Sequence, residues 1–199
     1  AADAALLSQA VGKPVRVQWM RHDEHGWEPF SPAMVMDLQA GLDAQGNLVG
    51  WDYEGWSQSH SNGEKGNYVA WRLLGTAPGW DRLSGGGGSP PYRCPNRRFV
   101  GHYVEPLLRA VYLRAPGGMQ STFVIESFVD ELAAASGVDS IDFRLRSMEQ
   151  PFSIEALKAV AQRAGWISRP SPGQKKSSGN VVQGRGVAFA GRGTLVPMI

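Results

Sequence analysis

The stretch LRAPGGMQSTFVIESF, residues 113–128, determines much of the predicted fold. Proline has no backbone N–H to donate, and paired glycines permit positive φ angles, so residues 115–118 predict a sharp turn. A run with helical spacing of apolar residues follows this turn. Backbone N–H groups at such a helix start favour anions, which makes the turn a candidate ligand site. The alternative is an ordinary strand-to-helix turn without a ligand, because Gly and Pro are common in turns.

The residues after the turn predict three short helices in tandem, over residues 113–168. The first of these helices ends at Gly137, and Glu126, Asp130 and Glu131 are expected to lie off its buried stripe. That stripe is predicted to consist of Val124, Phe128, Leu132 and Ala135.

The second and third helices have start and stop residues of their own. Asp139 is expected to cap the second helix, in which Arg144 and Arg146 point outward. Ser153 is expected to cap the third helix, which ends at Gly165. Their predicted apolar faces are Ile141, Leu145 and Met148 in the second helix, and Ile154, Leu157, Val160, Ala161 and Ala164 in the third.

The first thirty residues predict a helix end and a strand. Residues 1–11 have the character of the end of a helix, with Gly12 as its stop. Residues 13–20 alternate between β-branched or aromatic and polar side chains, which indicates a strand. The charged segment RHDEH, residues 21–25, favours a solvated or helix-starting loop over a metal site, because ligands on adjacent residues point in divergent directions.

A hairpin follows, and two further strands are predicted later in the chain. Residues 32–42 and 47–56 alternate as paired strands, and the connection between them ends in a glycine, Gly46, suited to a left-handed turn position. Residues 99–105 and 181–190 are also predicted as strands. Together these patterns predict an α+β fold, with a mixed sheet of strand hairpins followed by the three tandem helices.

The chain divides into four parts by composition. We expect a β-rich part at residues 1–112, with a long loop at 57–91, and a helical segment at residues 113–168. A polar linker at residues 169–180 and the start of a further strand region at residues 181–199 are expected to follow. The glycine run at residues 85–88 lacks the Gly-Lys-Ser/Thr ending of a phosphate-binding loop and indicates a flexible linker.

Composition excludes several classes of function. A net charge of +2 over 199 residues gives no electrostatic footprint for nucleic acid. Cys94 is the one cysteine, so neither an internal disulfide nor a cysteine metal site is predicted. No run of 18 apolar residues exists that would predict a membrane span. Tryptophans between residues 51 and 80 leave open a carbohydrate- or peptide-binding module, although no polar residues there converge on such a ligand.

Several segments in collinear order resemble one protein family. LRAPGGMQ (113–120) and FVIESFVDELA (123–133) are similar to the Arg-x-x-Gly-Gly-x-Gln…Glu-Ser…Asp-Glu-Leu-Ala motif of the molybdenum hydroxylases, the xanthine oxidase and aldehyde oxidase family. DFRLR (142–146) and GRGVA (184–188) resemble later segments of the molybdopterin-binding large subunit. The segment GKPVRVQWMR (12–21) is similar to the nicotinate dehydrogenase and isoquinoline oxidoreductase branch, and we expect an internal fragment of such a subunit.

The resemblance implies a cofactor and the residues beside it. The cofactor would be molybdopterin, in the cytosine dinucleotide form, with molybdenum. The residues carried over from the motif as cofactor-binding are Arg114, Ala115, Pro116, Gly117 and Gly118. An ordinary ion pair is the alternative for Arg114, and Gln120 is expected to be a helix-start residue rather than a direct contact. No catalytic residue and no metal ligand is assigned within the chain, because the family's catalytic glutamate lies outside the matched segments.

The implied activity is hydroxylation of an N-heteroaromatic compound or an aldehyde with oxygen from water. An iron–sulfur subunit would accept the electrons, with a cytochrome c as a further partner, in the cytoplasm or alternatively the periplasm. We expect these residues alone to be inactive. Met119 and Ser121 depart from the family motif, which has Pro and Gly there. The alternative is therefore a truncated or degenerate copy of the domain with no bound cofactor.

Overall fold

The chain is described by a computed structural model. The described residues are 2–28, 30–58, 90–104, 113, 115, 117–172, 180–181, 184–192 and 195–198. Most of the predicted loop at 57–91, residues 105–112 and most of the predicted linker at 169–180 lie outside these ranges.

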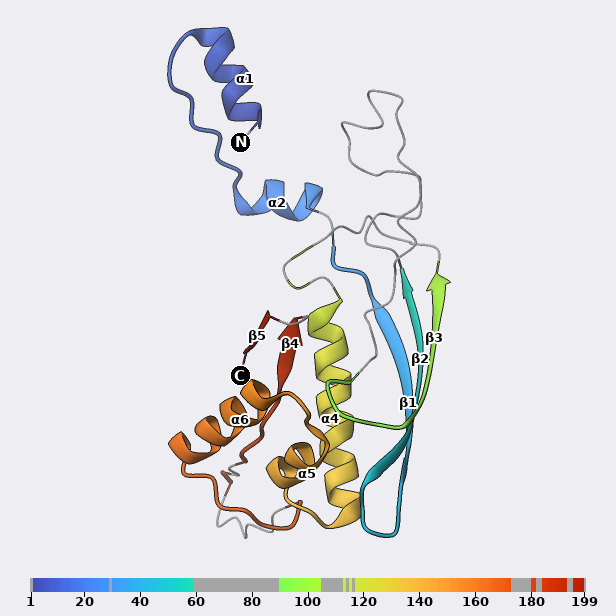
Figure 1. Cartoon of the computed structure of the whole chain (residues 1–199). Helices are drawn as coiled ribbons and strands as arrows, with labels where there is room; N and C mark the ends of the chain where they lie inside the picture. The colour runs from blue at the N-terminus through green and yellow to red at the C-terminus, as the bar shows by residue number, and fades with distance from the viewer. Residues whose placement is uncertain are drawn as a thin grey trace.

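A mixed three-stranded sheet forms one layer of the molecule (Figure 1). Strand β1 (Met34–Leu42) pairs antiparallel with β2 (Leu48–Gln58), and β2 pairs parallel with β3 (Asn96–Val104). The predicted hairpin and the α+β class are confirmed. Gly46 closes the hairpin turn with φ +77°, and the Asp43 carboxylate accepts the backbone N–H groups of Gln45 and Asn47. Hydrogen bonds from Asn47 lower the pKa of Asp43.

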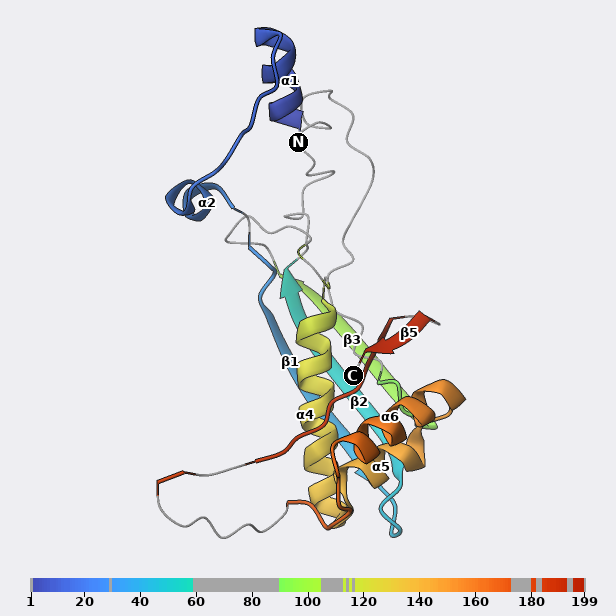
Figure 2. The same cartoon turned by 90° about the vertical axis from the view of Figure 1, so that its left-hand side faces the viewer.

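The three tandem helices are also confirmed: α4 (Gly118–Ser136), α5 (Ser140–Ser147) and α6 (Pro151–Arg163). Helix α4 lies along one face of the sheet, and α5 and α6 lie on the side of α4 away from the sheet (Figures 1 and 2). The expected start of α6 at Ser153 is wrong. Gln150 occupies the N-cap and Pro151 the first helical position, where the missing N–H of proline costs no intrahelical bond.

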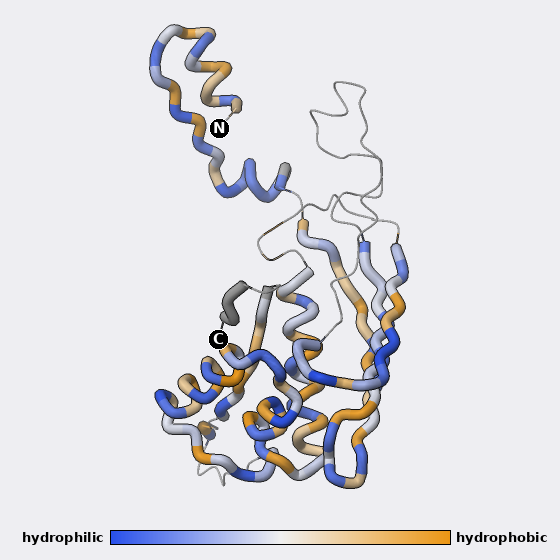
Figure 3. The backbone as a smooth tube through the Cα atoms, viewed as in Figure 1, coloured by the Kyte–Doolittle hydropathy of each residue, from blue (hydrophilic) through white to orange (hydrophobic). Residues whose placement is uncertain are grey.

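Two helices precede the sheet and stand apart from it in Figures 1 and 2. Helix α1 (Ala2–Val11) ends at Gly12 with φ +65°, as predicted, and helix α2 (Arg21–Trp27) contains the charged segment. No residue of α1 is buried, although Figure 3 shows apolar positions along it. The predicted strand at residues 13–20 is wrong: this segment belongs to no strand of the described sheets.

The C-terminal strand prediction is wrong for most of its length. Among the described residues of the predicted range, only Ala190 is in a strand, β4 (Ala190–Arg192), which pairs antiparallel with β5 (Leu195–Met198). Residues 184–189 approach α4 without joining a ladder. The backbone N–H of Phe189 instead donates to a side-chain carboxylate of Glu126 at 2.7 Å. The alternation of apolar and polar side chains in this segment therefore indicated extended backbone, but it could not show whether a neighbouring strand pairs with it.

The core lies between the sheet, α4 and the two shorter helices. Its buried apolar residues are Leu48, Trp51, Tyr53, Tyr92, Cys94, Ile125, Val129, Leu132, Ala133, Ile141, Phe143, Met148, Leu157 and Phe189. Trp51 on β2 meets Phe128 on α4 edge to face, at 5.4 Å between ring centroids, which joins the sheet to the helix. Within the described ranges, no helix is both long enough and apolar enough to cross a membrane.

Candidate cofactor-binding turn and the ion pair behind it

The Ala-Pro-Gly-Gly turn directly precedes α4 and contains two left-handed backbone positions. Ala115 has φ +56° and Gly117, the N-cap of α4, has φ +69°. A left-handed alanine is strained by roughly 1–2 kcal/mol, whereas Gly117 adopts the same region without a Cβ penalty. The carbonyl oxygen of Ala115 accepts the N–H groups of Gly118 at 3.0 Å and Met119 at 3.4 Å. The turn therefore consumes two N–H groups of the helix start internally.

The five residues assigned to this turn from the sequence are only partly described. Ala115, Gly117 and Gly118 lie together at the start of α4, with Gly117 buried. Arg114 and Pro116 lie outside the described residues, so their cofactor contacts stay a prediction.

Two polar side chains next to the turn, the half-buried Gln120 and the buried Ser121, have incomplete hydrogen bonding. Gln120 is in the first turn of α4, as expected for a helix-start residue, and its Nε2 donates to Ser31 Oγ at 3.0 Å. Its Oε1 atom and the Oγ atom of Ser121 are both buried and have no partner within the described structure. A buried polar atom left unpaired costs roughly 1–3 kcal/mol. Such atoms are rare in finished cores, so both need an explanation.

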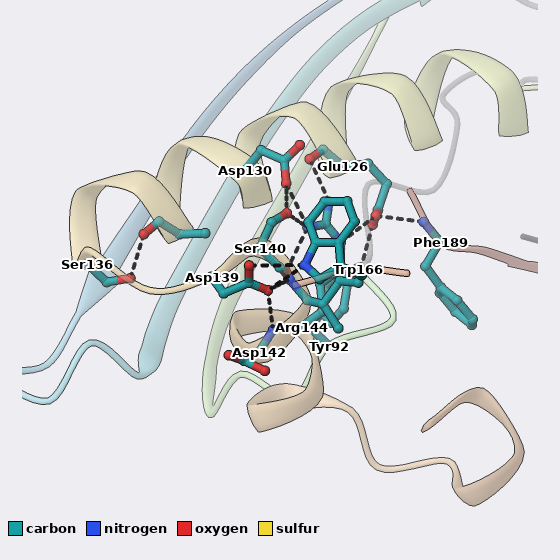
Figure 4. A network of polar contacts seen from close by, with 12 residues as sticks. Tyr92, Glu126, Asp130, Ser136, Asp139, Ser140, Asp142, Arg144, Trp166 and Phe189 are labelled. Atoms are coloured by element: carbon teal, nitrogen blue, oxygen red, sulfur yellow. Dashed lines mark hydrogen bonds and ion pairs between the residues drawn. The ribbon is translucent and has the colours of Figure 1, made fainter. Parts of the chain in front are cut away.

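Behind the turn, a fully buried arginine holds α4 and α5 together (Figure 4). The Arg144 side chain is 0% exposed. Its Nε donates to Glu126 Oε2 at 3.0 Å and its Nη2 to the Glu126 carbonyl oxygen at 3.1 Å. Its Nη1 donates to Asp130 Oδ1 at 2.7 Å and to the Ser140 carbonyl oxygen at 3.0 Å. A buried guanidinium requires acceptors on this scale, because an unpaired charge in the core is very costly.

The Glu126 carboxylate collects hydrogen bonds from three separate parts of the chain. It accepts the phenolic O–H of Tyr92 at 2.8 Å, the guanidinium of Arg144, and the N–H of Phe189. Tyr92 precedes β3, Arg144 lies on α5, and Phe189 precedes β4. One carboxylate on α4 therefore fixes the position of three neighbouring segments.

The structure overturns two sequence-based orientations in this region. Arg144 was expected to point outward and Glu126 to lie off the buried stripe, yet both are buried. The buried face of α4 is rotated and includes Ile125, Glu126 and Val129, whereas Ala135 is exposed. Helical spacing did carry the signal for Arg144, which follows Ile141 by three positions and precedes Met148 by four. At this position the helical spacing, not the charge of the side chain, indicates its burial.

A second buried carboxylate anchors the chain after α6. Asp139 caps α5 as predicted, accepting the N–H of Ile141 at 2.8 Å. The same carboxylate accepts the indole N–H of Trp166 at 3.1 Å and the backbone N–H of Arg169 at 3.1 Å. Asp139 thus joins the start of α5 to the segment that follows α6.

Burial and neighbouring charges shift the pKa values of Tyr92 and Arg144. Burial raises the pKa of Tyr92, and the neighbouring Glu126 charge raises it further. Burial by itself lowers the pKa of Arg144, but the Glu126 and Asp130 carboxylates more than offset this, so the pKa lies above its ordinary value. Arg144 is accordingly a permanent cation, and Tyr92 a permanent neutral donor, at neutral pH.

The fold and the turn belong to a known class of domain. The family model of the molybdopterin cofactor-binding domain matches residues 1–148, so the chain belongs to this family. The similarity reaches beyond the turn to the sheet, α4 and α5.

Individual relatives agree with this family. A nicotinate dehydrogenase subunit of Pseudomonas putida is 38% identical over 192 residues, which cover 95% of this chain and 16% of that protein. The aldehyde oxidoreductase molybdenum-binding subunit of Escherichia coli is 28% identical, over 97% of this chain and 26% of that protein. The aldehyde oxidoreductase structure from Desulfovibrio gigas shares the fold, with a TM-score of 0.55 and 20% identity over 82% of this chain and 19% of that chain. The chain thus spans about a quarter or less of each relative.

Arg144→Met should destabilise the chain by roughly 3–5 kcal/mol, because it leaves Glu126 buried without its cation. Arg146→Met on the same helix is the matched control: its side chain is exposed, so its effect should stay within about 0.5 kcal/mol. Urea unfolding measures both. Equal effects of the two substitutions would refute the role given to the buried ion pair.

The raised pKa of Tyr92 predicts a pH-dependent contribution to stability. The ordinary tyrosine pKa is 10.0, so above that pH the unfolded chain loses a proton that the folded chain retains, and stability falls as pH rises. At pH 7, Tyr92→Phe should cost about 1–3 kcal/mol by removing a hydrogen bond to a buried carboxylate. This difference from wild type should shrink as the pH rises through about 10 to 11 in unfolding measurements. A constant difference across that range would contradict the assignment.

Proposed function

We propose that this chain is the turn-bearing part of the molybdenum-cofactor subunit of an oxidoreductase. The complete subunit would hydroxylate an N-heteroaromatic compound or an aldehyde, with water as the oxygen source. The observation that carries the proposal is the family match over residues 1–148, together with 38% identity to a nicotinate dehydrogenase subunit over 95% of the chain. Relatives named for isoquinoline and aldehyde oxidation support the same substrate classes.

The residues at the turn fit a cofactor that approaches the backbone closely. Gly117 has no side chain, is buried and is left-handed, and strain at Ala115 is typical of backbone held for function. The buried, unpaired atoms of Gln120 and Ser121 require a polar neighbour. Ala115, Gly117 and Gly118 would therefore line the cofactor, with Arg114 and Pro116 beside them. When bound, the cofactor supplies the redox chemistry, and the chain supplies its position and surroundings.

Electron transfer would involve other polypeptides. The relatives are named as subunits of larger enzymes, which supports an iron–sulfur subunit as the acceptor, with a cytochrome c as a further partner. The cytosine dinucleotide form of the cofactor is proposed with the rest of the assembly. The competing function, a degenerate copy of the domain that binds no cofactor, is supported by the departures at Met119 and Ser121.

Two glycine substitutions distinguish these functions. Gly117 and Gly137 flank α4 with φ +69° and +66°, so alanine at either position should cost a similar, roughly 1–2 kcal/mol, of stability. Only Gly117→Ala adds a methyl group at the proposed cofactor wall. In the full-length subunit purified with its partners, we expect molybdenum per polypeptide to fall several-fold for Gly117→Ala and to stay near wild type for Gly137→Ala.

Metal analysis and unfolding of the same preparations provide the readout. A wild-type subunit that folds but contains no molybdenum and no pterin would support the degenerate copy. Equal molybdenum content in both variants would remove this turn from the cofactor site.

A further inference from the structure

A pocket of about 230 Å³ lies where the α4–α5 junction, the segment after α6 and residues 184–186 meet. All of its lining residues belong to the described ranges. Asp130 on its wall follows Gly117 by 13 positions, which places the pocket roughly 20 Å along α4 from the Ala-Pro-Gly-Gly turn. The proposed function gives this pocket no role.

Hydrogen bonds hold the walls of the pocket together. The Asp139 carboxylate accepts the indole N–H of Trp166 at 3.1 Å (Figure 4) and the backbone N–H of Arg169 at 3.1 Å. Arg185 Nη1 donates to two carbonyl groups just past the C-terminal end of α6, at 3.0 and 3.4 Å. Three separate segments are therefore tied to one another around the pocket, so that it is preformed, as small-molecule sites usually are.

Two of the lining side chains are arginines with unused hydrogen-bond donors. The exposed Arg169 side chain has no hydrogen bond or ion pair within the described ranges. Arg185 donates through Nη1, which leaves its Nε and Nη2 groups without a partner in the same ranges. A guanidinium presents its donors as a planar fork that matches the two oxygens of a carboxylate. The pocket can therefore bind a carboxylate.

The two aspartates of the pocket limit the charge of the ligand. Asp139 accepts N–H groups of α5, Trp166 and Arg169, and Asp130 Oδ1 is paired with the buried Arg144 at 2.7 Å. Asp130 Oδ2 has no partner within the described part of the chain, and it would repel a second carboxylate because neither group can donate a proton. The lining thus favours a ligand with a single negative charge.

A flat apolar surface adjoins the charged groups. Trp166 is half-buried, and its bond to Asp139 fixes the orientation of the indole ring. Pro170 and Pro172 line the same pocket, so ring surfaces of three residues are available to a planar ligand. Sites for drug-sized molecules have volumes of roughly 300–1,000 Å³, so the smaller volume here limits the ligand to a single ring system.

We propose that this pocket binds a small planar ring that carries one carboxylate, with the carboxylate on Arg169 and Arg185 and the ring against Trp166. The site goes beyond the proposed function and does not depend on it. Because the two arginines belong to different segments, the bound acid joins the segment after α6 to residues 184–186.

Benzoate is the probe, since at neutral pH it consists of one ring and one carboxylate. In ¹H–¹⁵N NMR spectra of the chain, benzoate should shift the Trp166 indole N–H and the Arg169 backbone N–H resonances. The expected dissociation constant is about 1–10 mM, which is typical of so small a ligand. Benzamide has the same shape without the charge and should bind about 10-fold more weakly. Phthalate, which carries a second carboxylate, should also bind more weakly than benzoate.

Arg169→Gln should weaken benzoate binding about 10-fold, measured at the Trp166 indole N–H, because it removes a charge-assisted contact. The substitution should leave the fold intact, since the Arg169 side chain has no partner within the described residues. Arg163→Gln is the matched control: it removes the same charge from an exposed position at the end of α6 that does not line the pocket. Its effect on binding should stay within about 2-fold.

Three results would overturn the inference. The first is the absence of shifts at Trp166 and Arg169 at about 50 mM benzoate. The second is equal binding of benzoate and benzamide, which would remove the carboxylate from the contact. The third is equal weakening by Arg169→Gln and Arg163→Gln, which would show attraction by net charge and not by this pocket.

Discussion

The ion pair between Arg144 and Glu126 is the constraint on which the rest of the structure depends. A fully buried guanidinium is tolerated only when its donors are matched by acceptors in fixed positions. Glu126 and Asp130 on α4 and Ser140 on α5 meet this demand, which fixes how the two helices pack. Because Glu126 also accepts from Tyr92 and Phe189, the same carboxylate sets the position of the segments that enter β3 and β4.

The middle and the N-terminal end of α4 have different roles: the middle holds neighbouring elements in place, and the N-terminal end carries the candidate binding site. The middle of α4 carries a network in which the carboxylates and the guanidinium are paired, and such a network holds an element rigidly. The N-terminal end of α4 carries the opposite situation, with a left-handed glycine and two unpaired buried oxygens among the described residues. Rigid support behind a set of unsatisfied groups is what a preorganised binding site requires. The segments that resemble the molybdenum hydroxylases thus serve two purposes, and those after the turn maintain its position.

Local patterns predicted the hairpin, the three tandem helices and the turn, because each depends on residues close in sequence. Gly46 and Gly137 mark positions where the backbone needs a positive φ, and both were identified from the sequence. Residues 13–20, 181 and 184–189 show the limit of this approach. Alternation identifies extended backbone, but a strand also needs a partner, which depends on distant residues. Local spacing beside Ile141 and Met148 indicated burial of Arg144, but it could not identify its acceptors Glu126 and Asp130, which are 18 and 14 positions away. The unpaired atoms of Gln120 and Ser121 have no sequence signal.

Amide hydrogen exchange at Phe189 tests the central claim most directly, because this N–H belongs to no strand ladder and is held by the Glu126 carboxylate. If the buried ion pair joins these segments, the Phe189 amide should exchange as slowly as the amides in the middle of α4, through the same opening of the structure. The amides of the exposed residues Arg185 and Gly186, a few positions earlier, should exchange rapidly. Rapid exchange at Phe189 alongside protected α4 amides would show that the carboxylate does not hold this segment, and would contradict the account.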